Sequence, residues 1–170
     1  MGSQSKLTDA RIRIKQPPAV TLRAGQRAMK HIAGNGLCAA DVSLVPGAAG
    51  GAKALALSAL DKAIFGRWLP SAPRPRLLIG ASIGSWRFAC AAQRDPVEAL
   101  TRFAEAYIEQ RYSPKPGIEE ITRTSEAMLD AIVAGHEDEI VAHADYRLAI
   151  LTARAKGWVA GEHRSKLMLV

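Results

Sequence analysis

A serine flanked by two glycines follows a short apolar run near the middle of the chain. Residues 77–79 read LLI and residues 80–84 read GASIG, which fits the pattern G-x-S-x-G. In a nucleophile elbow this pattern holds a serine on a sharp turn between a strand and a helix, and small neighbours prevent clashes across that turn. The pattern therefore predicts a nucleophilic hydroxyl on Ser82, with Gly80 and Gly84 as the small neighbours.

A nucleophilic serine also needs hydrogen-bond donors for the oxyanion that forms when it attacks an acyl carbon. The N–H of Ile83 is one expected donor, because it lies at the positive end of the following helix. Gly50 and Gly51 belong to a second glycine-rich turn, one strand–helix–strand unit earlier, and their N–H groups could complete the hole. Nucleotide binding is disfavoured, because this turn lacks the P-loop residues and the dinucleotide fingerprint is absent.

An alternation of strands and helices would bring these two turns together. Apolar patterns predict strands at 41–45, 77–79 and 146–153, and helices at 21–33, 53–65, 83–92, 96–111 and 118–134. Residues 70–75 and 135–138 are predicted to be irregular. Strands joined by helices favour a mainly parallel sheet, and we expect helices on both of its faces. Both turns would then lie at the carboxyl edge of the sheet, where such folds bind ligands.

Length and composition indicate one soluble α/β domain. The chain has 170 residues, of which 48% are apolar and 5% aromatic, so aliphatic side chains are expected to fill the core. Residues 1–18 are polar and end in two prolines, which predicts a flexible lead-in before a single domain over 19–170. Cys38 and Cys90 form no disulfide framework, and no apolar leader or membrane span is evident. We therefore expect a reducing, cytoplasmic location.

The net charge of +7 limits the kinds of partner that the chain could bind. Such a charge attracts phosphates, whether on nucleic acid or on an anionic lipid surface. The basic residues are scattered and are not interleaved with aromatic residues, so we expect no nucleic-acid binding. Peripheral contact with an anionic membrane is the partner that remains compatible with this pattern.

The two turns together resemble a known family. Residues 49–56 (AGGAKALA), followed after one crossover by residues 80–84, are similar to the patatin-like phospholipases, and residues 45–89 look like a bacterial subgroup. The resemblance implies a three-layer α/β/α fold and a Ser–Asp dyad that hydrolyses acyl esters of lipids through an acyl-enzyme on Ser82. It places Gly50, Gly51, Ala52 and Lys53 on the family's oxyanion turn, and it implies no cofactor and no metal.

The chain departs from this family in two respects. Ala49 and Ala54 replace the first and last glycines of the family's G-G-G-x-R/K-G turn, and Ala49 must avoid positive φ or bear strain. More important, the family's catalytic Asp lies in an Asp-Gly element, and this sequence contains no Asp-Gly dipeptide. A serine needs a base. We therefore expect an incomplete family domain that lacks its base and could self-associate through an uncovered sheet edge.

Two alternatives stay open. Ser82, Asp145 and His163 occur in the order of an α/β-hydrolase triad, so the chain could carry its own base. The chain could instead be a non-catalytic remnant that serves as a lipid-binding module. His136 and His143 lack the H-E-x-x-H spacing of a zinc site, and a solvated acidic turn is the simpler interpretation.

Three further side chains follow the two turns closely. Trp86 could line an acyl pocket or pack in the core. Lys53 and Arg87 could contact an anionic head group, or they could be ordinary side chains near a helix N-terminus. The sequence does not choose between these interpretations.

Overall fold

The computed structural model describes residues 21–154. The chain divides into two compact units between Leu37 and Cys38, and each unit is described by itself. The predicted lead-in at 1–18 and the residue His163 lie outside the described residues. The division falls inside the stretch 19–170 that the sequence suggested as one domain.

The first unit contains one described helix, α1 (Gln26–Asn35), where the sequence predicted a helix at 21–33. The N–H of Gly36 donates to the carbonyl of Ile32 and ends the helix. Gly36 has a φ of 78°, a left-handed conformation that favours glycine. None of the residues of α1 is buried.

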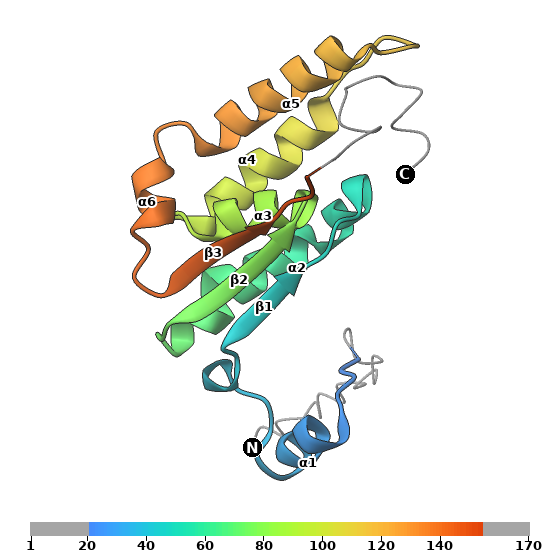
Figure 1. Cartoon of the computed structure of the whole chain (residues 1–170). Helices are drawn as coiled ribbons and strands as arrows, with labels where there is room; N and C mark the ends of the chain where they lie inside the picture. The colour runs from blue at the N-terminus through green and yellow to red at the C-terminus, as the bar shows by residue number, and fades with distance from the viewer. Residues whose placement is uncertain (1–20, 155–170) are drawn as a thin grey trace, which may run out of the picture. The chain divides into compact units, whose positions relative to one another are not determined.

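The second unit contains a parallel sheet of three strands, in the order β1-β2-β3 (Figure 1). The strands are β1 (Leu44–Gly47), β2 (Arg76–Ala81) and β3 (Tyr146–Leu151). In register, Leu78 lies between Val45 on one side and Leu148 on the other. The predicted parallel α/β class is therefore confirmed, and all three predicted strands are present.

Helices connect the strands largely where the sequence predicted them. The first crossover is a continuous helical segment made of the 3₁₀ turn η2 (Gly51–Leu57), α2 (Ser58–Ala63) and the π-helical η3 (Ile64–Trp68). The second crossover contains α3 (Ile83–Ala91), α4 (Pro96–Glu109), α5 (Ile118–Val133) and α6 (Glu137–Val141). Among residues 21–154, no helix combines the length and the apolar character needed to cross a membrane.

Two segments that the sequence predicted to be irregular contain short helices. Leu69–Ser71 forms the 3₁₀ turn η4, with Pro70 inside its first turn, where a missing N–H costs nothing. Residues 135–138 lead directly into α6, whose first turn contains Glu137, Asp138 and Glu139. These carboxylates stabilise the positive end of a helix, so the acidic run was a helix-start signal.

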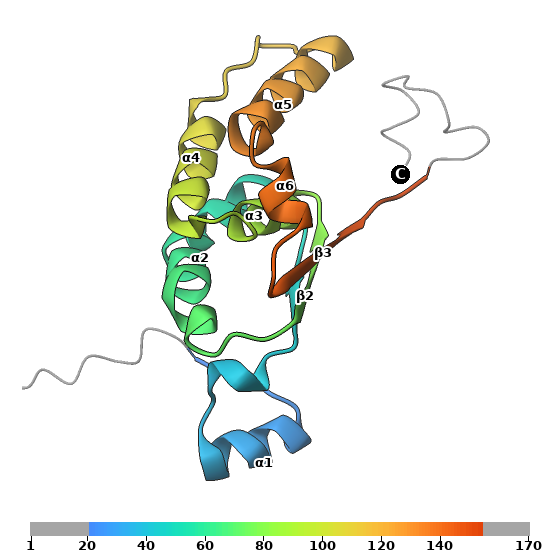
Figure 2. The ribbon, with the colours of Figure 1, turned by 90° about the vertical axis from the view of Figure 1, so that its left-hand side faces the viewer.

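The described helices of this unit lie on one face of the sheet (Figure 2). Right-handed crossovers between strands added in the order 1-2-3 place every connecting helix on the same side. The second helix layer expected from the sequence is therefore not among these helices. The opposite face carries Leu44 and Leu77, which are 47% and 38% exposed, while self-association through an uncovered edge stays a prediction.

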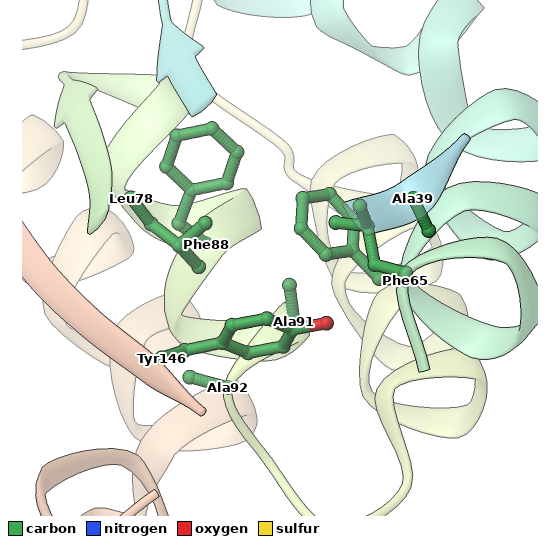
Figure 3. Close-up of a cluster of buried hydrophobic side chains, with 8 residues drawn as sticks. Ala39, Phe65, Leu78, Phe88, Ala91, Ala92 and Tyr146 are labelled. Atoms are coloured by element: carbon green, nitrogen blue, oxygen red, sulfur yellow. The ribbon is translucent and has the colours of Figure 1, made fainter. Parts of the chain in front are cut away.

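The core between sheet and helices combines aromatic and aliphatic side chains (Figure 3). Phe65 packs edge-on against Phe88 and Tyr146, with ring centroids 5.8 and 6.1 Å apart. Leu78 from the central strand is fully buried beside them. Most of the buried apolar residues are Ala, Leu and Ile, as the composition predicted, and the three aromatic rings pack among them.

Candidate functional site

Ser82 occupies a strained turn between β2 and α3. Its φ of 50° and ψ of −125° make it the one non-glycine residue with positive φ among residues 21–154. Such a conformation costs roughly 1–3 kcal/mol, and strain of this kind is concentrated at functional sites. Ser82 is nevertheless exposed. The predicted strand–turn–helix context of the G-x-S-x-G pattern is thus present, with the backbone of a nucleophile elbow.

The glycines beside Ser82 are required by close backbone contacts. A Cβ on Gly80 would lie 2.5 Å from the backbone of Ser85, and one on Gly84 would lie 2.2 Å from the carbonyl oxygen of Gly47. Gly47 itself leaves no room for a Cβ, which would lie 2.6 Å from the ring of Phe88. The two turns therefore pack directly on each other at the carboxyl ends of β1 and β2.

The second glycine turn approaches Ser82 at a shared cavity. Gly51 (φ 54°) begins η2, and Gly50 precedes it with a φ of 172° and a ψ of 1°. Gly51, Ser82 and Ile83 line one cavity of about 180 Å³. The first N–H groups of a helix have no partner within it, so those of Gly51 and Ile83 are suited to an oxyanion. Ala49 has no positive φ, so its replacement of glycine causes no strain there.

The other predicted oxyanion-turn residues do not line the cavities beside Ser82. Gly50 and Lys53 line a neighbouring cavity of about 370 Å³ that does not include Ser82. Ala52 and Lys53 are exposed on η2. The structure therefore brings Gly51 and Ile83 to the same cavity as Ser82, and it places Gly50, Ala52 and Lys53 around the outer side of the turn.

Ser82 also borders a second cavity, of about 340 Å³, between α3, α5 and the end of β3. Leu129, Ile150 and Leu151 form much of its wall. Trp86 lies between the two cavities and lines both of them. Trp86 is half-buried, so it contributes to the walls of the candidate site, one of the two interpretations that the sequence left open.

The side chain of Arg87 is bound to a carboxylate within the protein, and the residue also lines the cavity of Gly50 and Lys53. Its Nε and Nη2 atoms donate to the carboxylate of Asp61 at 2.6 and 2.5 Å, and both side chains are buried. This bidentate ion pair ties α3 to α2 and neutralises the charge of Arg87. The sequence offered no specific signal of this pair, because Asp61 stands beside Lys62 in α2 and a carboxylate in a charged helix is ordinarily solvated.

No general base is found beside Ser82 in the described part of the chain. The residues described as lining its two cavities include no Asp, Glu or His. Asp145 precedes β3, and the register pairs Tyr146 with Arg76 at the start of β2, whereas Ser82 follows the end of β2. Asp145 and Ser82 are therefore separated by the length of a strand, roughly 20 Å. The triad of Ser82, Asp145 and His163 is incompatible with this register.

His143 and His136 have local roles away from Ser82. The Nδ1 atom of His143 accepts hydrogen bonds from the N–H groups of Asp145 and Tyr146 at 3.1 and 3.0 Å. Burial lowers the pKa of His143 below its usual value, and the cation of Arg147 adds to this, against the opposing effect of Asp145. His136 Nδ1 lies 3.4 Å from the carboxylate of Glu139. His143 thus caps the start of β3.

The cysteines are free thiols in different environments. Cys38 is exposed, and its Sγ donates to Asp41 at 3.2 Å. Cys90 is buried in α3, and burial raises the pKa of its thiol to about 12. The thiolate is the reactive form of cysteine, so Cys90 is unsuited to act as a nucleophile near neutral pH.

Comparisons with known proteins give no information about the chemistry of this site, so its chemistry is inferred from its geometry. A scan against protein-family models found no match to the chain, and searches of curated proteins and of solved structures found none either. The resemblance to the patatin-like phospholipases therefore stays a hypothesis that depends on the two turns around Ser82.

Proposed function

We propose that the chain carries the nucleophile and oxyanion hole of a serine acyl hydrolase of the patatin-like type, acting on acyl esters of lipids. The observation that carries this proposal is the backbone of Ser82, which combines φ 50° and ψ −125° with an exposed position at the carboxyl end of β2. Backbone strain of this kind clusters at active sites and ligand-binding turns. A merely structural turn at this position would favour glycine or asparagine, which adopt positive φ at lower cost.

The chemistry follows from the groups around the shared cavity. The Oγ atom of Ser82 attacks the acyl carbon, and the carbonyl oxygen becomes an oxyanion that accepts hydrogen bonds from the N–H groups of Gly51 and Ile83. When the tetrahedral intermediate collapses, the bond to the alcohol oxygen breaks and the acyl group remains on Oγ. Water then attacks the acyl-enzyme and releases the carboxylic acid.

This reaction requires a base for the proton of Ser82 Oγ, and the same base returns that proton to the leaving alcohol. The described lining of the cavities supplies no such group. In this proposal the base comes from outside residues 21–154. It acts on the Oγ of Ser82, beside the oxyanion donors described above. Hydrolytic turnover is therefore a more demanding test than simple reactivity of Ser82.

A fluorophosphonate probe tests the nucleophile directly. The Oγ of Ser82 would bond to phosphorus and fluoride would leave, while the hydroxyl proton passes to solvent. We expect labelling of the wild type and of Ser58→Ala, and no labelling of Ser82→Ala. Ser58 is a matched control because it lies in α2 and lines neither cavity beside Ser82. Intact-protein mass spectrometry gives the stoichiometry, and circular dichroism shows that each variant is folded.

Absence of labelling on folded wild-type protein would overturn this proposal and favour a non-catalytic lipid-binding module. The apolar cavity beside Ser82 and the lack of a described base are the observations that favour this second candidate. Both candidates include peripheral contact with an anionic membrane, because the chain has a net charge of +7. Flotation with phosphatidylglycerol vesicles, but not with phosphatidylcholine vesicles, is the expected result at low salt.

A further inference from the structure

The two cavities on either side of Ser82 differ in chemistry. The first contains the hydroxyl groups of Tyr107, Tyr112 and Ser125 and the amide of Gln110. The second is lined by aliphatic and aromatic side chains, and its polar side chains are hydroxyls alone, with no charged group among them. An ester bound with its carbonyl carbon at Ser82 would therefore have a polar environment on one side and an apolar environment on the other.

From this contrast we propose that the cavity between α3, α5 and β3 is the acyl-chain subsite, and that the polar cavity receives the alcohol portion of the ester. The proposal rests on the function proposed for Ser82, because it assigns the two ends of that same substrate. Its apolar walls come from Leu129 of α5, Ile150 and Leu151 of β3, and Trp86 and Ala89 of α3. The cavity has a volume of about 340 Å³, within the range of roughly 300–1,000 Å³ typical of ligand sites.

Exposure of these apolar residues supports a ligand rather than a packed core. Leu129, Ile150 and Leu151 are 43%, 57% and 62% exposed, although they lie beside one another around the cavity. Grouped apolar side chains of this kind mark a binding surface. A hydrocarbon chain would cover them, and each methylene that it buries strengthens binding about fourfold.

The size of residue 129 is expected to limit the chain that the cavity accepts. Trp in place of Leu129 would fill the cavity, and the exposed position of Leu129 allows the larger side chain without disturbing the core. Ile121 is a matched control, since it lies in the same helix with 44% exposure and does not line the cavity. Leu151→Trp fills the cavity from β3. It is a second variant in case Leu129→Trp disturbs the folding of α5.

The first test measures binding without reaction, by titrating the full-length protein with dodecanoic acid and octanoic acid in a calorimeter. We expect dodecanoic acid to bind at least tenfold more tightly than octanoic acid. Leu129→Trp and Leu151→Trp should weaken dodecanoic acid binding at least tenfold, and Ile121→Trp should change it less than twofold. Equal binding to all four proteins, or no binding to the wild type, would overturn the subsite.

The second test relates the subsite to Ser82, by comparing labelling rates of ethyl and dodecyl fluorophosphonates. The ratio of dodecyl to ethyl rates should fall at least tenfold in Leu129→Trp, while the ethyl rate changes little. A ratio that is the same in both proteins would overturn the subsite although the nucleophile stands. If neither probe reacts but dodecanoic acid binding is lost in Leu129→Trp, the nucleophile fails and the chain-binding cavity is supported.

Discussion

The polar groups at the two ends of the sheet differ in their hydrogen bonding. At the amino ends of the strands, the buried guanidinium of Arg76 donates to the carbonyl oxygens of Ala39, Val42 and Ala72 at 2.9, 3.0 and 2.7 Å. At the carboxyl ends, Ser82 is strained and exposed, and the buried Oγ of Ser85 makes no hydrogen bond to any described residue. The amino end, where Arg76 is paired within the protein, is called the saturated end, and the carboxyl end, with Ser82 and Ser85, is called the open end.

Because of this difference, the amino end of the sheet is expected to contribute to stability and the carboxyl end to the proposed reactivity of Ser82. Hydrogen bonds that are completed within the protein stabilise the fold, whereas groups without partners cost stability unless a ligand completes them. The amino end therefore compensates for the strained carboxyl end. Substitutions at the amino end should act on unfolding alone, and substitutions at the carboxyl end should act on the reactivity of Ser82 as well.

The largest effect is expected at the contact between the two turns. In Gly84→Ala the new methyl group would lie 2.2 Å from the carbonyl oxygen of Gly47, so one of the two turns must move. We expect a loss of about 3 kcal/mol or more in the free energy of unfolding, measured by urea denaturation. Labelling of Ser82 should be lost in parallel wherever the protein still folds.

Gly50→Ala is the control for this substitution, since no atom lies within 4 Å of the added methyl group. A change below about 0.5 kcal/mol is expected. Equal destabilisation by both variants would show that the turns do not pack as described, and the comparison of the two ends would lose its basis.

The next largest effect tests the saturated end. Arg76→Met removes the guanidinium and leaves the carbonyl groups of the buried Ala39 and the half-buried Val42 and Ala72 without this donor. We expect the free energy of unfolding to fall by about 3 kcal/mol, with Ser82 labelling unchanged under conditions where the variant is folded. Arg67→Met, at an exposed position, should change stability by less than about 0.5 kcal/mol. Loss of labelling in folded Arg76→Met would contradict the separation of roles.

A smaller effect tests the strain at the open end. Glycine adopts positive φ without a side-chain clash, so Ser82→Gly should be more stable than Ser82→Ala by about 1 kcal/mol. The same pair of substitutions at Ser125, inside α5, should give the opposite order, because glycine destabilises a helix by about 1 kcal/mol relative to alanine. Urea midpoints check both pairs. If alanine were more stable than glycine at position 82 as well as at position 125, Ser82 would not be strained.

The sequence predicted the elements that local patterns define. Apolar runs located the three strands, and glycines marked the turns at residues 47–51 and 80–84, because a sharp turn or close backbone contact excludes other residues. The same local signals predicted that both turns lie at one edge of the sheet, since strands joined by helices run parallel. This part of the candidate site could be predicted because each turn consists of residues that are adjacent in the sequence.

The interactions between distant residues could not be predicted in the same way. Arg87 and Asp61 are 26 residues apart, and the carbonyls that Arg76 contacts lie up to 37 residues away. Neither pairing has a sequence pattern. The one-sided helix layer also needed the strand order, which the sequence did not provide, because an order of 1-2-3 and an order with a reversal have the same alternation of elements.

The smallest effect concerns the pH dependence of the saturated end. The Nδ1 atom of His143 can accept its two backbone hydrogen bonds only while it is unprotonated. Because burial lowers the pKa of His143 in the folded state, the unfolded chain takes up the proton first as the pH falls. The contribution of His143 to stability is therefore complete above its usual pKa of about 6.5 and decreases on acidification below it. Thermal unfolding midpoints at pH 7.5 and 5.5 measure this decrease.

His143→Asn separates this proton from others, because an amide oxygen can accept the same hydrogen bonds without titrating. The fall in midpoint between pH 7.5 and 5.5 should be smaller in His143→Asn than in the wild type. Glu120 and Glu139 do not interfere, because hydrogen bonds to Ser113 and Arg94 lower the pKa of each carboxyl and place its titration below this window. An equal fall in His143→Asn and the wild type would mean that stability does not depend on a neutral imidazole at position 143. The two hydrogen bonds that His143 Nδ1 accepts at the start of β3 would then contribute little to the stability of the amino end.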